Sequence, residues 1–390
     1  MEEWKLTKIG SLCKRVCSGG TPKSTVEEYY GGGIPWLNTK EVNFNRIYST
    51  ESTISESGLN NSSAKWIDAH SVIVAMYGAT AAKCAIGMIP MTTNQACCNL
   101  MIDEAIADYR FVYYALTNAY STLASLANGG AQQNLNAQLI KDFEILLPDL
   151  QTQHRIADIL STIDDKIENN NRINHNLEEQ AQALYKSWFI DFEPFKDGKF
   201  IDSELGMIPN GWQVKNLVEI SQLFDSKRKP LSGKDRDQMA KLYPYYGATS
   251  IMDYVDSYIF DGTYLLMGED GSVMTEDGYP FLQYVTGKFW PNNHAHVLQG
   301  NNGFSTEMLH CALLRKVIKS SVTGAVQAKI SQANMRKILF PCPSSVILKA
   351  FDSQLQTLYC QKRCIEAQNA NLASLRDSML PQLMSGQFNC

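Results

Sequence analysis

Several short polar segments hold side chains whose chemistry suits contacts with a nucleic acid. The segment Gly19-Gly20-Thr21-Pro22-Lys23 offers free backbone amides, a hydroxyl and an ammonium group, all of which can donate to phosphate oxygens. Asparagine and glutamine in Thr93-Asn94-Gln95 and in Gln132-Gln133 are residue types that bond adenine edges bidentately. Each segment is weak evidence alone, because a Gly-Gly-Thr-Pro sequence is also typical of a plain turn and such amides of a loop cap.

The second half of the chain holds comparable segments with more charge. Lys227-Arg228-Lys229 is its densest basic cluster, and Asn292-Asn293-His294 adds amides beside an imidazole. Gly268-Glu269-Asp270-Gly271 is either an acidic turn or a pair of acceptors for a cytosine amino group. We predict that nucleic-acid contacts come from the segments of both halves, at Gly19, Gly20, Thr21, Lys23, Thr93, Asn94, Gln95, Gln132, Gln133, Lys227, Arg228, Lys229, Asn293, His294, Gln327 and Lys329.

Motifs of catalysis are missing from the sequence. Gly31-Gly32-Gly33 leads into Ile34-Pro35 without the lysine of a phosphate-binding loop. No Asp/Asn-Pro-Pro-aromatic motif of an amino-methyltransferase occurs, and the six histidines lack the spacing of metal ligands. We therefore predict a non-catalytic chain without a metal site. Two alternatives remain: a nuclease or methyltransferase with an unfamiliar motif, and a coiled-coil adaptor that binds only protein.

The polar segments recur because the chain repeats itself once. Residues 4–9 match 212–217, and 34–36 match 243–245. Later landmarks pair residues 76–78 with 266–268, 93–96 with 292–295, 133–136 with 328–331, and 174–177 with 369–372. The last two pairs share an offset of 195 residues. A repeat of this length indicates a duplicated domain, since solenoid units are far shorter. The constant offset suggests two domains held a fixed distance apart.

Two long helices are expected to position the duplicated domains. From Ile156 to Trp188, seam residues recur at alternating steps of four and three, which is the a/d pattern of a coiled coil. The second copy keeps this spacing, and Pro194 and Pro381 are expected to end the helices. We predict antiparallel packing of the helices on each other, with packing of each on its own domain as the alternative. The seam of the pair is predicted at Ile156, Leu160, Ile163, Ile167, Asn174, Leu177, Leu184, Phe351, Leu355, Leu358, Ile365, Asn369 and Leu372.

Composition is that of an ordinary globular protein. The 390 residues suffice for two domains with separate cores. No run of about 18 apolar residues suggests a membrane span, and the N-terminus lacks the features of a signal peptide, so we expect a cytoplasmic protein. The ten cysteines have the spacing of neither a zinc site nor a disulfide framework. A net charge of −5 predicts weak DNA binding by the chain alone, with partners supplying part of the attraction.

Each globular half mixes short strands with glycine-marked turns. Residues 71–76 and 263–267 have the pattern of strands, and residues 108–126 and 306–319 that of helices. We predict an α+β fold in which each half has a mostly antiparallel, curved sheet. The two long helices, packed as an antiparallel coiled coil, are expected to relate the halves by a pseudo-two-fold axis.

Further motifs carry a family resemblance. The most specific stretch is Trp188-Phe189 with Asp191-Phe192, followed by Leu205-Gly206-x-Ile208-Pro209-x-Gly211-Trp212. The tail adds Leu380-Pro381-x-Leu383-Met384-Ser385-Gly386. With the repeat and the helices, these motifs resemble the specificity subunit of type I restriction-modification systems over essentially the whole chain. The sequence departs from that family at Pro341-Cys342-Pro343-Ser344-Ser345-Val346, at the start of the second helical region, where an acidic residue and a glutamine like those around Gln153 are usual.

The resemblance implies a non-catalytic subunit that recognises a bipartite, asymmetric site in double-stranded DNA. It implies that two modification subunits bind the helices and methylate adenine with S-adenosylmethionine, and that restriction subunits use ATP and Mg²⁺ for cleavage. The chain itself would bind no cofactor and contact no membrane. The implied parts are a first target-recognition domain at 1–149, a helical spacer at 150–193, a linker with the second target-recognition domain at 194–343, and a second helical spacer at 344–390.

Overall fold

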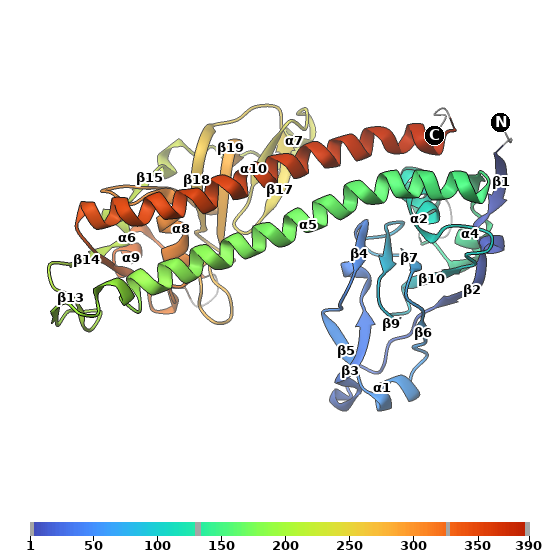
Figure 1. Ribbon diagram of the computed structural model, residues 1–390, viewed down its shortest axis with the longest axis horizontal. Coiled ribbons are helices and arrows are strands. Elements are labelled where there is room, and N and C mark those ends of the chain that lie inside the picture. The colour runs from blue at the N-terminus through green and yellow to red at the C-terminus, as the bar shows by residue number, and fades with distance from the viewer. Residues whose placement is uncertain (1–3, 129–133, 325–327, 387–390) are drawn as a thin grey trace. The chain divides into compact units, whose positions relative to one another are not determined.

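The computed structural model describes residues 4–128, 134–324 and 328–386, which form two compact units (Figure 1). Unit 1 takes in the described residues up to Asn169 together with those from Gln368 onward. Unit 2 comprises the described part of Asn170–Ala367. Each unit therefore contains one globular half of the repeat and a portion of both long helices.

Unit 1 is built on two sheets. Its strands are β1 Lys5–Lys8, β2 Cys13–Ser18, β3 Tyr30–Leu37, β4 Asn45–Ile47, β5 Ser52–Ile54, β6 Trp66–Ile67, β7 Ser71–Ala75, β8 Cys84–Gly87, β9 Met91–Thr93, β10 Cys97–Ile102 and β11 Glu144–Leu147. One sheet has the order β2-β10-β7-β8-β4 and the other β5-β3-β9-β6, while β1 pairs with β11. Only the pairs β4–β8 and β3–β9 are parallel among the described strands of this unit. The predicted mostly antiparallel α+β architecture is confirmed here.

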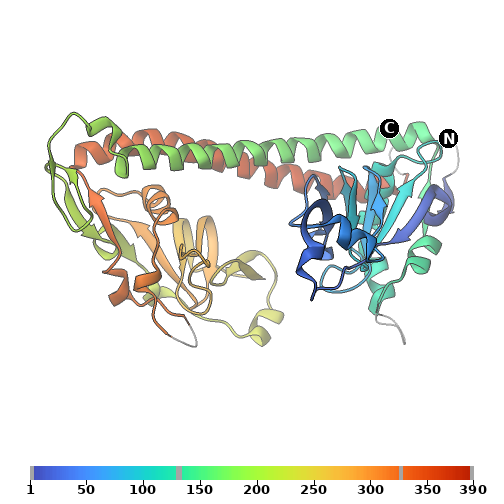
Figure 2. The same ribbon diagram turned by 90° about the horizontal axis from the view of Figure 1, so that it is seen from below.

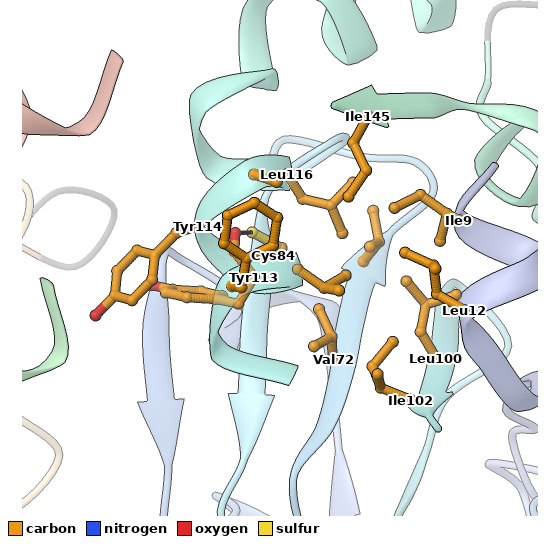
Figure 3. Packing of buried hydrophobic residues seen from close by; sticks show 14 of the residues in the cluster. Ile9, Leu12, Val72, Cys84, Leu100, Ile102, Tyr113, Tyr114, Leu116 and Ile145 are labelled. Atoms are coloured by element: carbon orange, nitrogen blue, oxygen red, sulfur yellow. Dashed lines mark hydrogen bonds between the residues drawn. The ribbon is translucent and has the colours of Figure 1, made fainter. Parts of the chain in front are cut away.

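Short helices pack on these sheets, namely α1 Glu56–Asn60, α2 Tyr109–Asn118, α3 Tyr120–Asn128 and α4 Ala137–Asp142. The Asp108 carboxylate caps α2 by accepting from the Arg110 amide at 2.8 Å. The single helix predicted over 108–126 is thus two helices that meet at Ala119. Val72 and Leu100 of the sheet and Leu116 of α2 belong to one buried core with Ile9 (Figure 3). Each such side chain stabilises the fold by roughly 1.5–3 kcal/mol.

Unit 2 has one large sheet of order β15-β20-β18-β19-β16-β17 and the small pairs β14–β21 and β12–β13. Its strands are β12 Phe200–Ile201, β13 Ile208–Pro209, β14 Gln213–Asn216, β15 Ser221–Leu223, β16 Tyr243–Tyr246, β17 Ile251–Val255, β18 Phe260–Gly268, β19 Leu282–Pro291, β20 Ala295–Gly300 and β21 Leu339–Cys342. Its short helices are α6 Leu217–Ile220, α7 Gly233–Asp237, α8 Thr306–Leu314 and α9 Gln332–Met335. The helix predicted over 306–319 therefore ends early, at Leu314.

The two units share one strand plan. Strands β2, β10, β7 and β8 of unit 1 have the neighbours that β15, β20, β18 and β19 have in unit 2. In unit 2, β18 and β19 are continuous strands. In unit 1 each of them is replaced by two shorter strands, which are β6 and β7 in place of β18, and β8 and β9 in place of β19. Gly262 and Gly287 pair across β18 and β19, and both have a positive φ. Glycine is suited to this position because it adopts such a backbone without steric cost.

Equivalent backbone hydrogen bonds correct two of the predicted matches between the halves. The Met76 amide donates to Ala96 O and the Glu269 amide to His294 O, each at 2.8 Å. Residues 76–78 therefore match 269–271, not 266–268, and Gly78 and Gly271 both have a positive φ. Residues 93–96 likewise match 291–294, one position from the prediction. The end of β18 resembles residues 76–78 in sequence, so the sequence comparison matched the wrong residues. The positions equivalent to residues 76 and 77 are the acidic pair Glu269 and Asp270.

The two long helices are α5 Leu150–Phe189 and α10 Ser345–Met384. In unit 1, Ile156 and Leu160 of α5 share a core with Leu380 and Leu383 of α10. In unit 2, Ala181, Tyr185 and Phe189 of α5 share a core with Leu348, Phe351 and Leu355 of α10. The start of each helix thus packs with the end of the other, which confirms the antiparallel pair, and both views show the two ribbons side by side in each unit (Figure 2).

The predicted helix ends need correction. Helix α5 ends at Phe189, before Pro194, and Phe192 has a left-handed backbone with φ 53°. Helix α10 continues through Pro381 to Met384, followed by Gly386 with φ 70°. A proline inside a helix costs about 3 kcal/mol, and burial of Leu380, Leu383 and Met384 in the core of unit 1 offsets this cost. Among the described residues no helix is long and apolar enough to cross a membrane.

Candidate nucleic-acid interface

The predicted loops of unit 1 converge at one end of its five-stranded sheet. We call the loop end of unit 1 the segments 18–23, 76–80, 93–96 and 134–136, which adjoin β2, β7, β10 and α4. The Gly20 amide donates to Thr93 O at 2.8 Å, and the Leu135 amide to Met76 O at 3.0 Å. A Cβ atom on Gly19 would lie 2.1 Å from Thr93 O. Glycine is required there because two backbones touch.

The amides of Gly19 and Gly20 are not free, contrary to the prediction. They donate to Cys97 O and Thr93 O, so they shape the loop and are not available to a phosphate group. Asn94 also acts as a loop cap, since its Oδ1 accepts from the Ala96 amide at 3.1 Å. Thr93 is fully buried and accepts from Asn99 Nδ2 at 2.8 Å. Of the predicted contact residues at this loop end, Thr21, Lys23 and Gln95 have exposed side chains, and Asn134 and Asn136 are exposed beside them.

The exposed side chains of Thr21 and Gln95 contact each other. The Thr21 hydroxyl is hydrogen-bonded to Gln95 Oε1. This contact joins two segments that are far apart in the sequence, since Thr21 and Gln95 are separated by 74 residues. It leaves the amide nitrogen of Gln95 as a potential donor to a ligand. Unit 1 therefore presents a small, uncharged polar surface with one lysine beside it.

The equivalent loop end of unit 2 comprises 224–229, 268–271, 292–294 and 328–331, which adjoin β15, β18, β20 and α9. Arg228 lies at its centre. The guanidinium is within 2.6 Å of both Glu269 Oε2 and Ala295 O, and within 3.7 Å of Asp225. Only 12% of the side chain is exposed. Arg228 was predicted to contact a nucleic acid, but the structure assigns its donors to the protein, where it holds three loops together.

The remaining predicted residues of unit 2 face solvent. Lys227, Lys229, Asn293, His294 and Lys329 are exposed. The Lys227 ammonium lies 5.2 Å from the centre of the Phe224 ring, and Lys329 Nζ lies 3.6 Å from Glu269. His294 Nδ1 contacts the Asp270 carboxylate. Unit 2 thus presents three lysines and an Asn-His pair around a buried charged centre. Gln132, Gln133 and Gln327 lie outside the described residues.

Sequence reasoning missed the charged pair beneath these loops. His296 Nδ1 lies 2.7 Å from Asp225 Oδ2, and its Nε2 lies 2.9 Å from Ile330 O. Both partners present acceptor oxygens to the ring nitrogens, so the arrangement favours the doubly protonated, charged imidazole. Burial lowers the pKa of His296, but the Asp225 carboxylate, the Ile330 carbonyl and Glu269 outweigh it and raise the pKa above 6.5. Burial raises the pKa of Asp225, but His296, the Val297 amide and Gln332 bring it down to about 2.

Asp225, Glu269 and His296 have the residue types and proximity of metal ligands. The arrangement does not favour an ion, however, because Arg228 already neutralises the two carboxylates and both His296 nitrogens are engaged. A metal would need to displace the guanidinium and deprotonate the imidazole. The cluster is better described as a buried ion network that fixes the loops.

Comparison with known proteins identifies the family. The family model described as type I restriction modification DNA specificity domain matches residues 1–179 and 209–363. The chain belongs to this family. It is 28% identical over 409 residues to the type I restriction enzyme MjaIX specificity subunit of Methanocaldococcus jannaschii, covering 99% of this chain and 94% of the relative. It is also 21% identical over 353 residues to the HindI specificity subunit of Haemophilus influenzae, covering 70% of this chain and 75% of the relative.

A solved structure shares the fold. The S subunit of a type I restriction-modification system from M. genitalium has a TM-score of 0.54 and 19% identity, covering 98% of this chain and 96% of that chain. These findings confirm the predicted resemblance and the predicted α+β fold with two duplicated domains. They also confirm the prediction of a specificity subunit, which is a non-catalytic component of its complex.

Proposed function

We propose that this chain recognises a bipartite, asymmetric sequence in double-stranded DNA, with each unit contacting one half of the sequence. The observation that supports this most is the duplication of the loop end: the same four loops meet at the same end of the sheet in both units. Their exposed side chains differ between units, so two copies of one frame can contact two different half-sites. Base edges give sequence specificity, and phosphates give position.

The exposed residues divide into two chemical classes. Lys23, Lys227, Lys229 and Lys329 suit phosphate contacts, which are independent of sequence. Side-chain amides and an imidazole suit the edges of bases, and these groups belong to Gln95, Asn293 and His294. In this proposal Gly19, Gly20, Thr93, Asn94 and Arg228 act indirectly, by holding the loops that carry the contacting residues. Gln132, Gln133 and Gln327 remain predicted contacts.

Partner subunits are part of the proposal. The net charge of −5 is unfavourable for tight DNA binding by the chain alone. Two modification subunits bound along the helices would add charge and methylate adenine with S-adenosylmethionine, and restriction subunits would use ATP and Mg²⁺ for cleavage. The complex would act in the cytoplasm. Tight, sequence-specific binding by the isolated chain at physiological salt would contradict this division of roles.

The test is an exchange of one globular domain. Residues 1–149 are replaced by the corresponding domain of another family member, and methylated adenines are mapped across the host genome. We expect one half of the methylated sequence to change while the other half and the spacing are retained. Exchange of residues 194–343 is the matched control and should change only the other half. A change in both halves after either exchange would show that the two units do not recognise DNA independently.

A further inference from the structure

Each globular domain docks on one of the long helices through a polar contact surface. In unit 1 the helix is α5, and its contribution to this first docking surface is acidic. The Asp158 carboxylate accepts from Arg110 Nη1 at 2.7 Å, and Asp164 accepts from the Tyr114 hydroxyl at 2.5 Å. The globular domain therefore supplies cations and phenols, and the helix supplies carboxylates.

Two further groups of the domain extend the first docking surface along α5. Arg46 forms an ion pair with Asp165 and lies 3.6 Å from Glu168, and only 10% of the arginine side chain is exposed. The Tyr48 hydroxyl donates to Glu168 Oε2 at 2.8 Å. Four carboxylates of one helix face are thus neutralised or hydrogen-bonded by the domain.

In unit 2 the helix is α10, and the second docking surface has the reverse charges. Glu307 of α8 is 6% exposed, and it accepts from Arg363 Nη1 and Gln356 Nε2 of α10, each at 2.9 Å. The Tyr359 hydroxyl of α10 lies 2.7 Å from His310 Nδ1. Burial lowers the pKa of His310 to about 4, so this imidazole is neutral. Here the domain supplies the carboxylate, and the helix supplies the cation and the phenol.

The reversal occurs at equivalent positions. Arg110 and Glu307 are each the second residue of their helix, two positions after the capping residue Asp108 or Ser305. Glu168 and Arg363 are each the nineteenth residue of their long helix, and Asp164 and Tyr359 each the fifteenth. The charge is therefore inverted at one equivalent position of the domain and at one equivalent position of the helix, although Arg110 pairs with Asp158 and Glu307 with Arg363. Such paired inversion is the pattern by which related interfaces exclude each other's partners.

We propose that the two docking surfaces are mutually exclusive, so that each globular domain can settle only on its own long helix. On α10, the domain of unit 1 would place Arg46, which lies 3.6 Å from Glu168 on α5, near the equivalent Arg363. On α5, the domain of unit 2 would bring the buried Glu307 against Asp164 and Glu168. Like charges at a buried contact are strongly unfavourable, and an unpaired buried carboxylate adds its own cost. The two domains cannot exchange places, so the order in which the chain presents them is fixed.

The decisive experiment compares two full-length chimaeric chains. In both, residues 212–342 are replaced by a second copy of residues 4–147, and the apolar helix residues in contact with it take their unit 1 identities. One chain keeps the polar residues of α10, and the other carries Ser353→Asp, Gln356→Ser, Tyr359→Asp, Cys360→Asp and Arg363→Glu, which are the identities of α5. We expect limited proteolysis to cut the second copy at least tenfold faster in the chain that keeps the polar residues of α10. Equal cleavage rates would overturn the proposal.

A second set of variants tests the same proposal in case both chimaeric chains are degraded and cannot be compared. In the native sequence, Glu307→Arg and Arg363→Glu singly leave like charges in contact, and the double variant restores an ion pair with the orientation of unit 1. We expect each single variant to unfold at a temperature several degrees lower, and the double variant to recover at least half of the loss. Lys349→Glu on the exposed face of α10 is the control and should change little. A double variant no more stable than the worse single variant would contradict the proposal.

Discussion

The loop ends of the two units stabilise one backbone arrangement by different chemistry. In unit 1, Ser18, Met76 and Cys98 are uncharged, and two glycines bring the loops into direct backbone contact. In unit 2 the equivalent positions are Asp225, Glu269 and His296, which form an ion network around Arg228. The equivalence is supported by matching strand pairs, since β2 pairs with β10 as β15 does with β20.

The comparison shows that the duplicated frame constrains the backbone more than the side chains beneath it. Bonds such as Met76 to Ala96 and Glu269 to His294 have the same length, although one is surrounded by apolar groups and the other by charges. Close packing of neutral groups should be insensitive to pH and sensitive to added volume. A buried ion network should instead be sensitive to the loss of one charge.

The largest effect is expected from removing the central cation of unit 2. Arg228→Met leaves Glu269 without its nearest cation at a site where that carboxylate is 15% exposed. Breaking a buried pair in this way typically costs about 3–5 kcal/mol, so unit 2 should unfold at a clearly lower denaturant concentration. Lys229→Met, one residue away and exposed, is the control and should stay within about 0.5 kcal/mol. Similar stability of the two variants would mean that Arg228 does not hold the loops.

The next largest effect is expected from adding a methyl group in unit 1. A Cβ atom at Gly20 would lie 2.2 Å from the Ala64 nitrogen, which belongs to the backbone and cannot rotate away. Gly20→Ala should therefore destabilise unit 1 by about 2–3 kcal/mol and speed hydrogen exchange at residues 93–97. Gly33→Ala has open space around it and should be nearly neutral. Normal protection of residues 93–97 in Gly20→Ala would contradict the close-packing account.

A pH effect of intermediate size should be confined to unit 2. The raised pKa of His296 means that its contribution to stability is present at and below pH 6.5 and is lost as pH rises through the raised value. The ionised carboxylate of Asp225 stabilises the fold at pH values above its usual pKa. This contribution to stability is lost only as the pH falls toward the lowered pKa of about 2. The other charged groups in contact with this pair are Glu269 and Arg228, with Lys329 beyond Glu269.

Chemical unfolding of unit 2, measured at several pH values from 6 to 9, tests the direction of this pH dependence of stability. The stability of the wild-type chain should fall as pH rises, and His296→Gln should remove that slope. Unit 1 offers an internal control, since Ser18 and Met76 do not titrate and burial raises the pKa of Cys98 to about 12. An equal slope in both units would show that His296 is not the group responsible.

The smallest effects should come from the exposed lysines, and they concern binding more than stability. Lys227→Gln, Lys229→Gln and Lys329→Gln should each lower the salt dependence of DNA binding by about one unit of slope, with stability unchanged. Lys23→Gln should do the same in unit 1, where the loop end has fewer exposed cations. Binding is measured in the presence of the partner subunits. Slopes unaffected by all four changes would place the phosphate contacts elsewhere.

The architecture was largely predictable because it is encoded in spacing. The heptad pattern from Ile156 to Trp188 predicts a long helix without any knowledge of tertiary contacts. The equal sequence offsets between matching segments predict the duplication. The helix ends were less predictable. Pro381 is a stop signal in isolation, but buried neighbours in unit 1 keep the helix intact to Met384.

The candidate site was predictable in outline and not in detail. Gly-Gly and Asn-Gln segments indicated loops that the structure brings together, but whether a side chain faces solvent depends on strands far away in sequence. In the sequence, Arg228 belongs to a basic cluster with no acidic partner beside it. In the structure it pairs with Glu269, which is 41 residues away in the sequence. His296 and Asp225 are 71 residues apart in the sequence, so no local sequence pattern predicts their ion pair.

The division of unit 1 between two distant stretches of chain bears on its synthesis. Leu380, Leu383 and Met384 complete a core whose other members end at Leu160. A ribosome that adds roughly 5–20 residues per second needs on the order of 10–40 s to pass from Asn169 to Gln368. During this interval the nascent domain exposes apolar surface that later residues will cover. A chain cut short by a late stop codon would thus leave its first domain, although fully translated, open to chaperones and proteases.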